Sequence, residues 1–347
     1  MKDKKLRFGI VGTNFISDWF IAGARQDERF EAAAVYSRTQ ETASVFASRH
    51  GIERTFTSLD EMVASPFIDA VYIASPNFLH ASQSILCMEH RKHVLCEKPL
   101  AANANEARQM IEAARRCGVT LMEAMKPTLT PNFLAVMSNL SRVGKVRRYF
   151  ASYCQYSSRY DKFKEGIVLN AFRPEYANGA LLDIGIYTIY PMTILFGRPD
   201  TISASGIILS SGVDGQGAVN FTYKSGMNAT VLYSKIADSA LPAEIQGEEG
   251  RITLDRINTI SRINLTMRQQ ATSDKGLPPE TIDISTTTNK DEYFYETNEF
   301  ISLAISGKNE SRINSHKNSL ITIEIMDEVR RQLGIIYPSD SQAAGER

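Results

Sequence analysis

Short apolar runs alternate with amphipathic stretches along the first third of the chain. Runs rich in β-branched and other apolar residues predict strands at 6–11, 30–36, 70–74, 93–96 and 120–124. Apolar positions recur at helical spacing over 15–25, 39–50, 59–64, 79–90 and 104–117, the last opened by a capping box, Asn103-Ala104-Asn105-Glu106. Strands that alternate with helices are typical of βαβ units, so we expect an α/β fold with a doubly wound parallel sheet.

The pattern changes at residues 125–131, where two prolines precede a sequence dominated by strands and turns. Short Ile-, Val- and Thr-rich runs over 201–285 predict a large open, mostly antiparallel sheet, with turns at 213–215, 224–226 and 248–250. Apolar helices are predicted at 179–196, 293–305 and 315–333. We therefore expect an N-terminal α/β domain over 1–126, a C-terminal α+β domain over 127–338 and a frayed tail over 339–347.

One face of the sheet predicted for the second domain would be left exposed to solvent. Because helices of the chain are expected on the other face, we expect the open face to form a homodimer or a homotetramer.

Composition supports two ordinary hydrophobic cores, since 43% of the 347 residues are hydrophobic. The formal net charge is zero and no long basic run occurs, so we expect no nucleic-acid partner and no membrane partner. The first apolar run, 6–11, is too short for a signal peptide, and we expect a cytoplasmic protein. The four cysteines lack metal-ligand spacing, so we expect reduced thiols and no metal site: Cys87, Cys96, Cys117 and Cys154.

The segment between the first strand and the first helix is placed to bind a diphosphate at a helix N-terminus. Gly12 suits the tight turn, while Asn14 and Ser17 stand where a glycine and a small residue are expected. Asn tolerates positive φ better than most residues, so this departure is acceptable. An ordinary strand–helix turn also fits this segment taken alone. The candidate phosphate-binding residues are Gly12, Thr13, Asn14, Phe15 and Ile16.

The end of the second strand predicts which dinucleotide binds. An acidic residue usually holds the ribose of NAD there, whereas this chain has Ser37 and Arg38. Arginine offers a forked and permanently charged donor set for a 2′-phosphate. We therefore expect NADP to be preferred, with NAD still possible; the alternative is that Arg38 is an ordinary solvated residue.

Further polar stretches follow predicted parallel strands, where such sheets bind ligands. They are Ser75-Pro76-Asn77-Phe78-Leu79-His80, Cys96-Glu97-Lys98-Pro99-Leu100 and Met122-Glu123-Ala124-Met125, and a fourth, Asn178-Gly179-Ala180-Leu181-Leu182-Asp183-Ile184-Gly185-Ile186-Tyr187, opens an apolar helix. Together they resemble the glucose-fructose oxidoreductase, inositol dehydrogenase and MocA family over nearly the whole chain. The ending over 330–338 is similar to the dimeric dihydrodiol dehydrogenase branch.

The resemblance implies a Rossmann domain followed by a substrate domain with an open sheet. It also implies a catalytic group of Lys98, Asp183 and Tyr187, and places Arg173 and Tyr176 near the substrate. The cofactor-binding residues would include Ser75, Pro76, Asn77, Glu97 and Lys98, while His80 either contacts the ligand or holds local structure.

Elementary electrostatics supports the lysine–tyrosine pair. A free tyrosine, with a pKa near 10, lies roughly 4 kcal/mol from half-ionisation at neutral pH. A lysine ammonium about 4 Å away supplies about 4 kcal/mol at an effective dielectric constant near 20. Asp183 and Tyr187 stand four apart on one helix and so share a face, and we expect Lys98 to meet them across the cleft between the domains. Tyr190 is a rival proton donor.

The sequence therefore predicts an NAD(P)-dependent oxidoreductase that transfers a hydride between a nicotinamide cofactor and a sugar, polyol or related hydroxy or carbonyl compound. Two alternatives stay open. One is an enzyme that retains NAD and cleaves glycosides by transient oxidation, and the other is a non-catalytic NADP-binding regulator.

Overall fold

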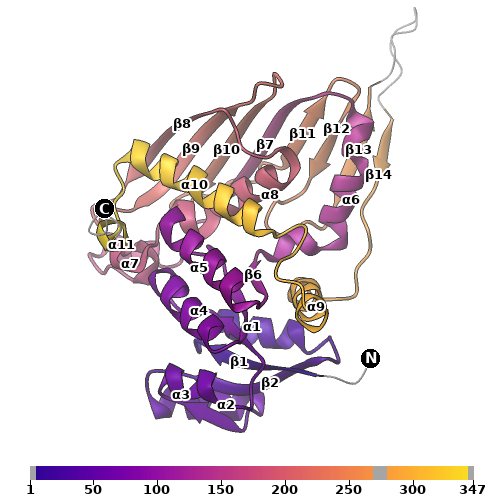
Figure 1. Ribbon diagram of the computed structural model, residues 1–347. Helices are drawn as coiled ribbons and strands as arrows, with labels where there is room; N and C mark the ends of the chain where they lie inside the picture. The colour runs from indigo at the N-terminus through magenta and orange to yellow at the C-terminus, as the bar shows by residue number, and fades with distance from the viewer. Residues whose placement is uncertain (1–4, 269–279, 343–347) are drawn as a thin grey trace, which may run out of the picture. The chain divides into compact units, whose positions relative to one another are not determined.

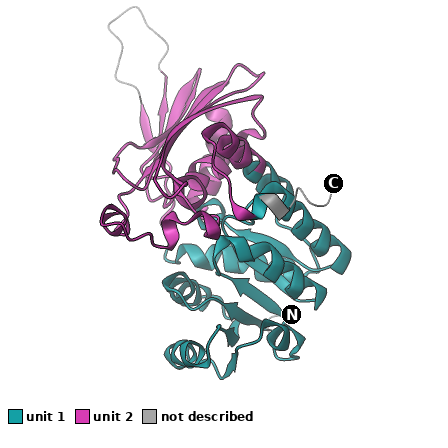
Figure 2. Ribbon diagram, turned by 90° about the vertical axis from the view of Figure 1, so that its left-hand side faces the viewer, with its two compact units in different colours: residues 1–129, 289–323, 339–347 teal, residues 130–288, 324–338 magenta. Residues whose placement is uncertain are grey.

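The computed structural model describes residues 5–268 and 280–342, which form two compact units (Figure 2). Unit 1 comprises Met1–Leu129, Asn289–Ile323 and Ser339–Arg347, and unit 2 comprises Thr130–Thr288 and Glu324–Pro338. From residue 289 onward the chain thus alternates between the two units, whereas the sequence analysis placed all of 127–338 in one domain.

Unit 1 is built on a six-stranded parallel sheet with the strand order β3-β2-β1-β4-β5-β6. This order confirms the predicted doubly wound fold. Figure 1 labels its strands β1, β2 and β6. The chain reverses direction across the sheet between β1 and β4, and in such sheets ligands bind beyond the carboxyl ends of the strands at that point. The strands are β1 (Leu6–Val11), β2 (Phe30–Tyr36), β3 (Arg54–Phe56), β4 (Ala70–Ile73), β5 (His93–Glu97) and β6 (Leu121–Ala124).

Helices connect these strands, as the spacing of apolar positions predicts. They are α1 (Phe15–Ala24), α2 (Gln40–His50), α3 (Leu59–Ala64), α4 (His80–Glu89) and α5 (Ala104–Cys117). Asn103 caps α5 by accepting a hydrogen bond from the Glu106 amide at 3.0 Å, so the predicted N-cap is confirmed. The short edge strand β3 was not predicted, because its three residues carry no apolar alternation.

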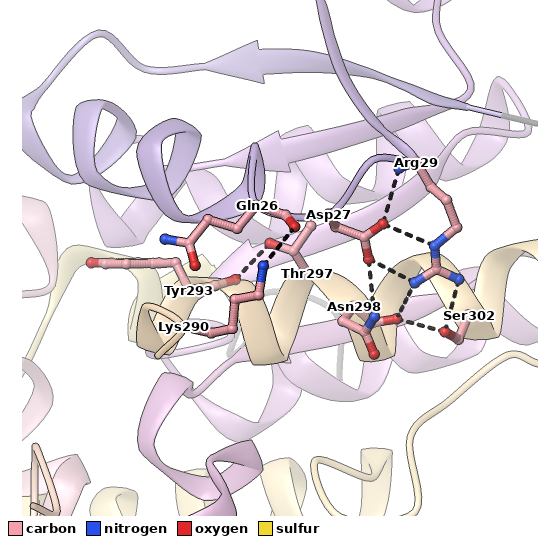
Figure 3. A network of polar contacts seen from close by, with 8 residues as sticks. All are labelled: Gln26, Asp27, Arg29, Lys290, Tyr293, Thr297, Asn298 and Ser302. Carbon is pink, nitrogen blue, oxygen red and sulfur yellow. Dashed lines mark hydrogen bonds and ion pairs between the residues drawn. The ribbon is translucent and has the colours of Figure 1, made fainter. Parts of the chain in front are cut away.

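Helix α9 (Glu292–Ile305) follows the second unit in sequence but packs on α1 of the first. Figure 3 shows the polar contacts that fix it. The Asp27 carboxylate binds Arg29 at 2.7 Å and accepts from the Asn298 amide at 3.0 Å. Arg29 in turn donates to the Ser302 hydroxyl at 3.2 Å. These partners, with Phe300 buried in the unit 1 core, place 289–323 in unit 1 and not in the second domain.

Unit 2 is built on an eight-stranded sheet with the order β14-β13-β12-β11-β7-β10-β9-β8. Every neighbouring pair is antiparallel except β10 and β7, so the predicted mostly antiparallel sheet is confirmed. The strands are β7 (Val146–Cys154), β8 (Thr201–Ile208), β9 (Asp214–Thr222), β10 (Asn228–Ser234), β11 (Ala243–Gly247), β12 (Gly250–Leu254), β13 (Ile263–Met267) and β14 (Thr281–Asp283).

The turn predicted at 213–215 was wrong. Asp214 and Gly215 open strand β9, and the chain turns earlier, at Gly212, where φ is +92°. Asp214 is wholly buried, and its carboxylate accepts a hydrogen bond from the Leu181 amide at 2.7 Å, which offsets part of the cost of burial.

The main helix of unit 2 packs against the sheet. It begins with a π-helical turn, η6 (Leu181–Gly185), and continues as α8 (Ile186–Phe196), and the Tyr149 hydroxyl of β7 donates to the Thr188 carbonyl at 2.9 Å. Pro174–Phe196 has the length and hydropathy of a membrane span, but most of it is buried in the protein. It therefore acts here as a core helix.

The remaining helices are divided between the two units. Unit 2 also contains α6 (Pro131–Asn139) and α7 (Tyr160–Lys164), while α10 (His316–Leu333) runs from unit 1 into unit 2. The start of the tail that was expected to fray forms a short helix, α11 (Pro338–Gln342), and the Asn103 amide donates to the Asp340 carboxylate at 3.4 Å. Residues 343–347 lie outside the described residues.

Candidate active site

The turn after β1 contains the glycine that a dinucleotide-binding fold requires. Gly12 has φ of +103°, and a Cβ atom there would lie 2.6 Å from the Ala74 carbonyl oxygen at the end of β4. Only glycine allows both this backbone conformation and this close approach. The turn therefore brings the start of α1 to the carboxyl end of β4, which fits a diphosphate site.

Asn14 has a different role from the one expected. Its φ is −91°, so no positive φ is needed. The side-chain oxygen accepts from the Ile16 amide at 2.9 Å, and the side-chain nitrogen donates to the Ala74 carbonyl at 2.8 Å. Ser17 donates its hydroxyl to the Gly12 carbonyl at 2.8 Å. Both departures from the glycine pattern thus stabilise the turn by capping α1 and linking it to β4. Thr13 and Phe15 lie in the same turn.

Ser37 and Arg38 follow the last residue of β2, one strand from Gly12 in the sheet. The Ser37 hydroxyl lies 2.6 Å from the Thr42 hydroxyl in α2, and the Arg38 side chain is exposed. The positions from 36 to 40 carry no carboxylate. This end of β2 therefore offers donors but no acidic acceptor for a ribose.

The stretch after β4 reaches the same edge of the sheet. The Ser75 hydroxyl donates to the Gln83 side chain at 2.7 Å, Pro76 is exposed, and Asn77 begins a short 3₁₀ turn. His80 is buried, with one ring nitrogen 2.8 Å from the Pro99 carbonyl and the other 2.9 Å from the Ser75 carbonyl. The ring thus links the ends of β4 and β5, which is the structural role left open for it.

Lys98 stands directly after β5, next to a cis peptide bond with Pro99. Glu97 accepts a hydrogen bond from the Tyr72 hydroxyl at 2.5 Å and another from the Lys98 amide at 3.2 Å. Burial raises the pKa of Glu97, while the Lys98 ammonium opposes this effect. The Glu97 side chain therefore fixes the strand end from which Lys98 projects.

Two more buried carboxyl groups lie around this strand end. Glu123, in β6, accepts from the Leu100 amide at 2.8 Å, and burial raises its pKa to about 7. Glu296, in α9, is wholly buried, and burial together with the charge of Glu97 raises its pKa well above the ordinary value. Sequence reasoning noted Glu123 only as part of the Met122-to-Met125 stretch and did not identify Glu296, because the proximity of these acids to Glu97 arises only in the folded unit.

In unit 2, Asp183 lies in the π-helical turn that precedes α8. Asp214 holds the start of this turn through the Leu181 amide, and burial raises the pKa of Asp214 to about 6. A Cβ atom at Gly179, where φ is +145°, would lie 2.3 Å from the Asp214 carboxylate. The Gly179-to-Asp183 segment is therefore shaped around the Asp214 side chain.

Tyr187 is in the first turn of α8 and is 9% exposed. Its ring packs edge-on against the ring of Tyr153 in β7, with the centroids 5.6 Å apart. Tyr190, the rival donor, is wholly buried. Of the two phenols, Tyr187 alone retains some access to solvent.

Arg173 and Tyr176 lie before this helix. The guanidinium of Arg173 is 5.9 Å from the centroid of the Tyr176 ring, and its Nε donates to the Val168 carbonyl at 3.0 Å. The two predicted substrate residues thus contact each other, and Arg173 is exposed.

Lys235, directly after β10, forms an ion pair with the Asp183 carboxylate. Sequence reasoning did not identify Lys235. The only available signal was that this lysine directly follows the apolar strand run Val-Leu-Tyr-Ser, and a lysine that is buried at such a position needs a charged partner.

Within the described part of the chain, no group of three or more His, Cys, Asp or Glu side chains could hold a metal ion. All four cysteines are free thiols, and burial raises the pKa of Cys87 and Cys96.

Comparison with known proteins gives the family. Residues 6–125 match the NAD-binding Rossmann domain of the GFO/IDH/MocA oxidoreductases, and residues 139–253 match the C-terminal domain of that family. The scyllo-inositol 2-dehydrogenase (NADP(+)) IolU of Bacillus subtilis (strain 168) is 49% identical over 335 residues, which span 96% of this chain and 99% of that protein.

Two further proteins are similar over their whole length. The trans-1,2-dihydrobenzene-1,2-diol dehydrogenase of Danio rerio is 34% identical, over 97% of this chain and 99% of its own. The crystal structure of an NAD binding oxidoreductase from Klebsiella pneumoniae has the same fold, with a TM-score of 0.81, 21% identity and coverage of 95% and 97%. The chain therefore belongs to the GFO/IDH/MocA family and is an NAD(P)-dependent oxidoreductase that acts on CH–OH groups.

Proposed function

We propose that this enzyme transfers a hydride between NADP, in preference to NAD, and a sugar, polyol or related hydroxy or carbonyl compound. The names of its relatives support a substrate with several hydroxyl groups, since one is a dehydrogenase of an inositol and another of a cyclic diol. The observation that carries the proposal lies at the start of the helix that bears both Asp183 and Tyr187. There the Asp183 carboxylate is paired with the buried ammonium of Lys235, which follows β10.

Each residue of the proposed catalytic group has one task. The nicotinamide ring, when bound, accepts or supplies the hydride. Tyr187 takes the proton from the substrate hydroxyl during oxidation and returns it during reduction. Lys98 stabilises the phenolate form of Tyr187 by its positive charge. Asp183 accepts a hydrogen bond from a substrate hydroxyl.

The cofactor would be held by unit 1. We assign the diphosphate to the turn containing Gly12, Thr13, Asn14, Phe15 and Ile16, because Gly12 leaves room for a close approach to the backbone. Ser37 and Arg38 would bind the 2′-phosphate of the adenosine ribose. Ser75, Pro76, Asn77 and Glu97 would line the nicotinamide half, with His80 holding the two strand ends in place. In unit 2, Arg173 and Tyr176 would contact the substrate.

A substrate panel tests the reaction. Purified enzyme is mixed with inositols, aldoses and dicarbonyl sugars, with each cofactor in turn, and formation or loss of reduced cofactor is followed by absorbance. We expect turnover of at least one polyol with NADP. Sugar release from a glycoside without net change in cofactor would instead identify the cofactor-retaining glycosidase. Tight NADP binding without turnover would identify a regulator.

Two substitutions test the residue roles. Lys98→Met and Tyr187→Phe should each lower kcat by at least about 100-fold, the lower range for loss of a general acid–base group. The NADP dissociation constant, measured by fluorescence titration, should change little in Tyr187→Phe. Lys308→Met, which removes an exposed lysine from unit 1, is the control. Full activity in either variant would contradict its assigned role.

We also propose that the enzyme is a cytoplasmic homodimer or homotetramer, joined through the open face of the eight-stranded sheet. The support is the sheet itself, which packs one face against α8.

A further inference from the structure

Lys235 is a buried lysine whose backbone is fixed on both sides. Its amide donates to the Gly215 carbonyl of β9 at 2.8 Å, and its carbonyl accepts from the Ser157 amide at 2.9 Å. The side chain is only 5% exposed. Its amine therefore starts from a rigid part of the sheet and has little freedom to reach solvent.

The lysine amine contacts a carboxylate and an aromatic ring. One is the Asp183 carboxylate, which forms the ion pair through Oδ2. The other is the ring of Phe172, whose centroid lies 5.7 Å from Nζ and which is wholly buried. An ammonium in such surroundings is costly without a counterion, because burial removes its hydration. The Asp183 carboxylate therefore supplies the counterion that the buried Lys235 ammonium needs.

A second acid lies near Lys235 but has another partner. One carboxylate oxygen of Asp214 accepts a hydrogen bond from the Leu181 amide. Burial raises the pKa of Asp214 to about 6. Asp214 thus stabilises the start of the helix through the Leu181 amide, while Lys235 forms its ion pair with Asp183.

The two members of the pair differ in exposure. The Asp183 side chain is 33% exposed, against 5% for Lys235. The lysine thus holds the carboxylate from its buried side, while about a third of the Asp183 side chain stays exposed to solvent. A carboxylate held in this way can accept a hydrogen bond from a hydroxyl but has no proton to donate.

We propose that Lys235 is a positioning residue that holds Asp183 as a hydrogen-bond acceptor for a hydroxyl of the substrate. The inference rests on the proposed function, because it assigns Asp183 to the substrate.

A double-mutant cycle tests the proposal. Lys235→Met should lower kcat/KM for the best polyol of the panel about 10- to 100-fold, the range of couplings between contacting residues. The KM for the cofactor should not change. Lys235→Arg, which keeps the charge, should restore most of the activity. Because Lys235 acts through Asp183, adding Lys235→Met to Asp183→Asn should cost little more than Asp183→Asn alone.

Lys224→Met is the matched control, since the Lys224 side chain is 90% exposed in the same unit. Lys235→Gln replaces the Met variant if that variant does not fold. Full activity of the neutral variants, or losses that multiply in the double variant, would overturn the proposal.

A second readout is independent of turnover. Carboxyl labelling with a water-soluble carbodiimide and glycine ethyl ester requires a protonated or weakly paired acid, and is located by mass spectrometry. Labelling of Asp183 should rise severalfold in Lys235→Met, because the carboxylate loses its ammonium partner, and should stay low in Lys235→Arg and Lys224→Met. If the wild-type enzyme turns over no compound of the panel, the proposed function fails, and unchanged labelling would separately show that Lys235 does not hold Asp183.

Discussion

Arg38 is exposed at the end of β2, where its guanidinium has no acidic neighbour within two residues. We predict that Arg38→Ala lowers kcat/KM with NADP by about 10- to 100-fold, the equivalent of one or two charge-assisted hydrogen bonds to phosphate. The value with NAD should not change, since NAD lacks the 2′-phosphate. Initial rates with both cofactors measure this.

The control for Arg38 is Arg116→Ala, which removes an arginine with a side chain 62% exposed from the same unit. A wild-type enzyme that uses NAD with a higher kcat/KM than NADP would contradict the assignment of Ser37 and Arg38.

At the scale of single elements, strand β6 carries an acid that is costly to ionise. Burial raises the pKa of Glu123 from 4.5 to about 7. The folded protein therefore binds this proton more tightly than the unfolded chain does. The resulting stabilisation is complete below about pH 4.5 and is lost as the pH rises through about 7, a change of about 3 kcal/mol.

Glu123→Gln should remove this part of the pH dependence, because a neutral amide can still accept from the Leu100 amide. Relative to the wild type, we expect the variant to gain up to about 3 kcal/mol of unfolding free energy between pH 5 and pH 8. Urea unfolding at both pH values measures it. Glu112→Gln, an exposed acid in α5, should show no such gain. Parallel pH curves for Glu123→Gln and wild type would refute the prediction.

At the scale of the whole molecule, the sheet of unit 2 has an inner and an outer face. Along β10, Ala229, Val231 and Tyr233 are buried, so the alternating Leu232 points to the outer face, where it is half-buried. If this face joins two copies of the chain, Leu232→Glu should shift the wild-type oligomer to monomer, because it places a charge in the interface. Sedimentation velocity measures the shift.

Val45→Glu, which charges an exposed apolar position on α2 of unit 1, should leave the assembly intact. A wild-type protein that is monomeric at high concentration would end the proposal of a sheet-mediated oligomer.

The sequence by itself determined the order and type of most elements of unit 1, because apolar spacing reports which face of a helix or strand is buried. It also determined Gly12, since a tight strand–helix turn requires glycine, and it indicated Lys98, Asp183 and Tyr187 through their motifs. Only the tertiary structure showed that Asp214 is a buried cap and not a turn residue. Only the tertiary structure showed that α9 belongs to unit 1 and not to the second domain.

The pairing of Lys235 with Asp183 joins residues 52 positions apart. Nothing local to either residue predicts it, because the need for a counterion arises only when folding removes the lysine from water. Local patterns thus decide elements and turns, whereas the partners of buried charges depend on which distant segments the fold brings together.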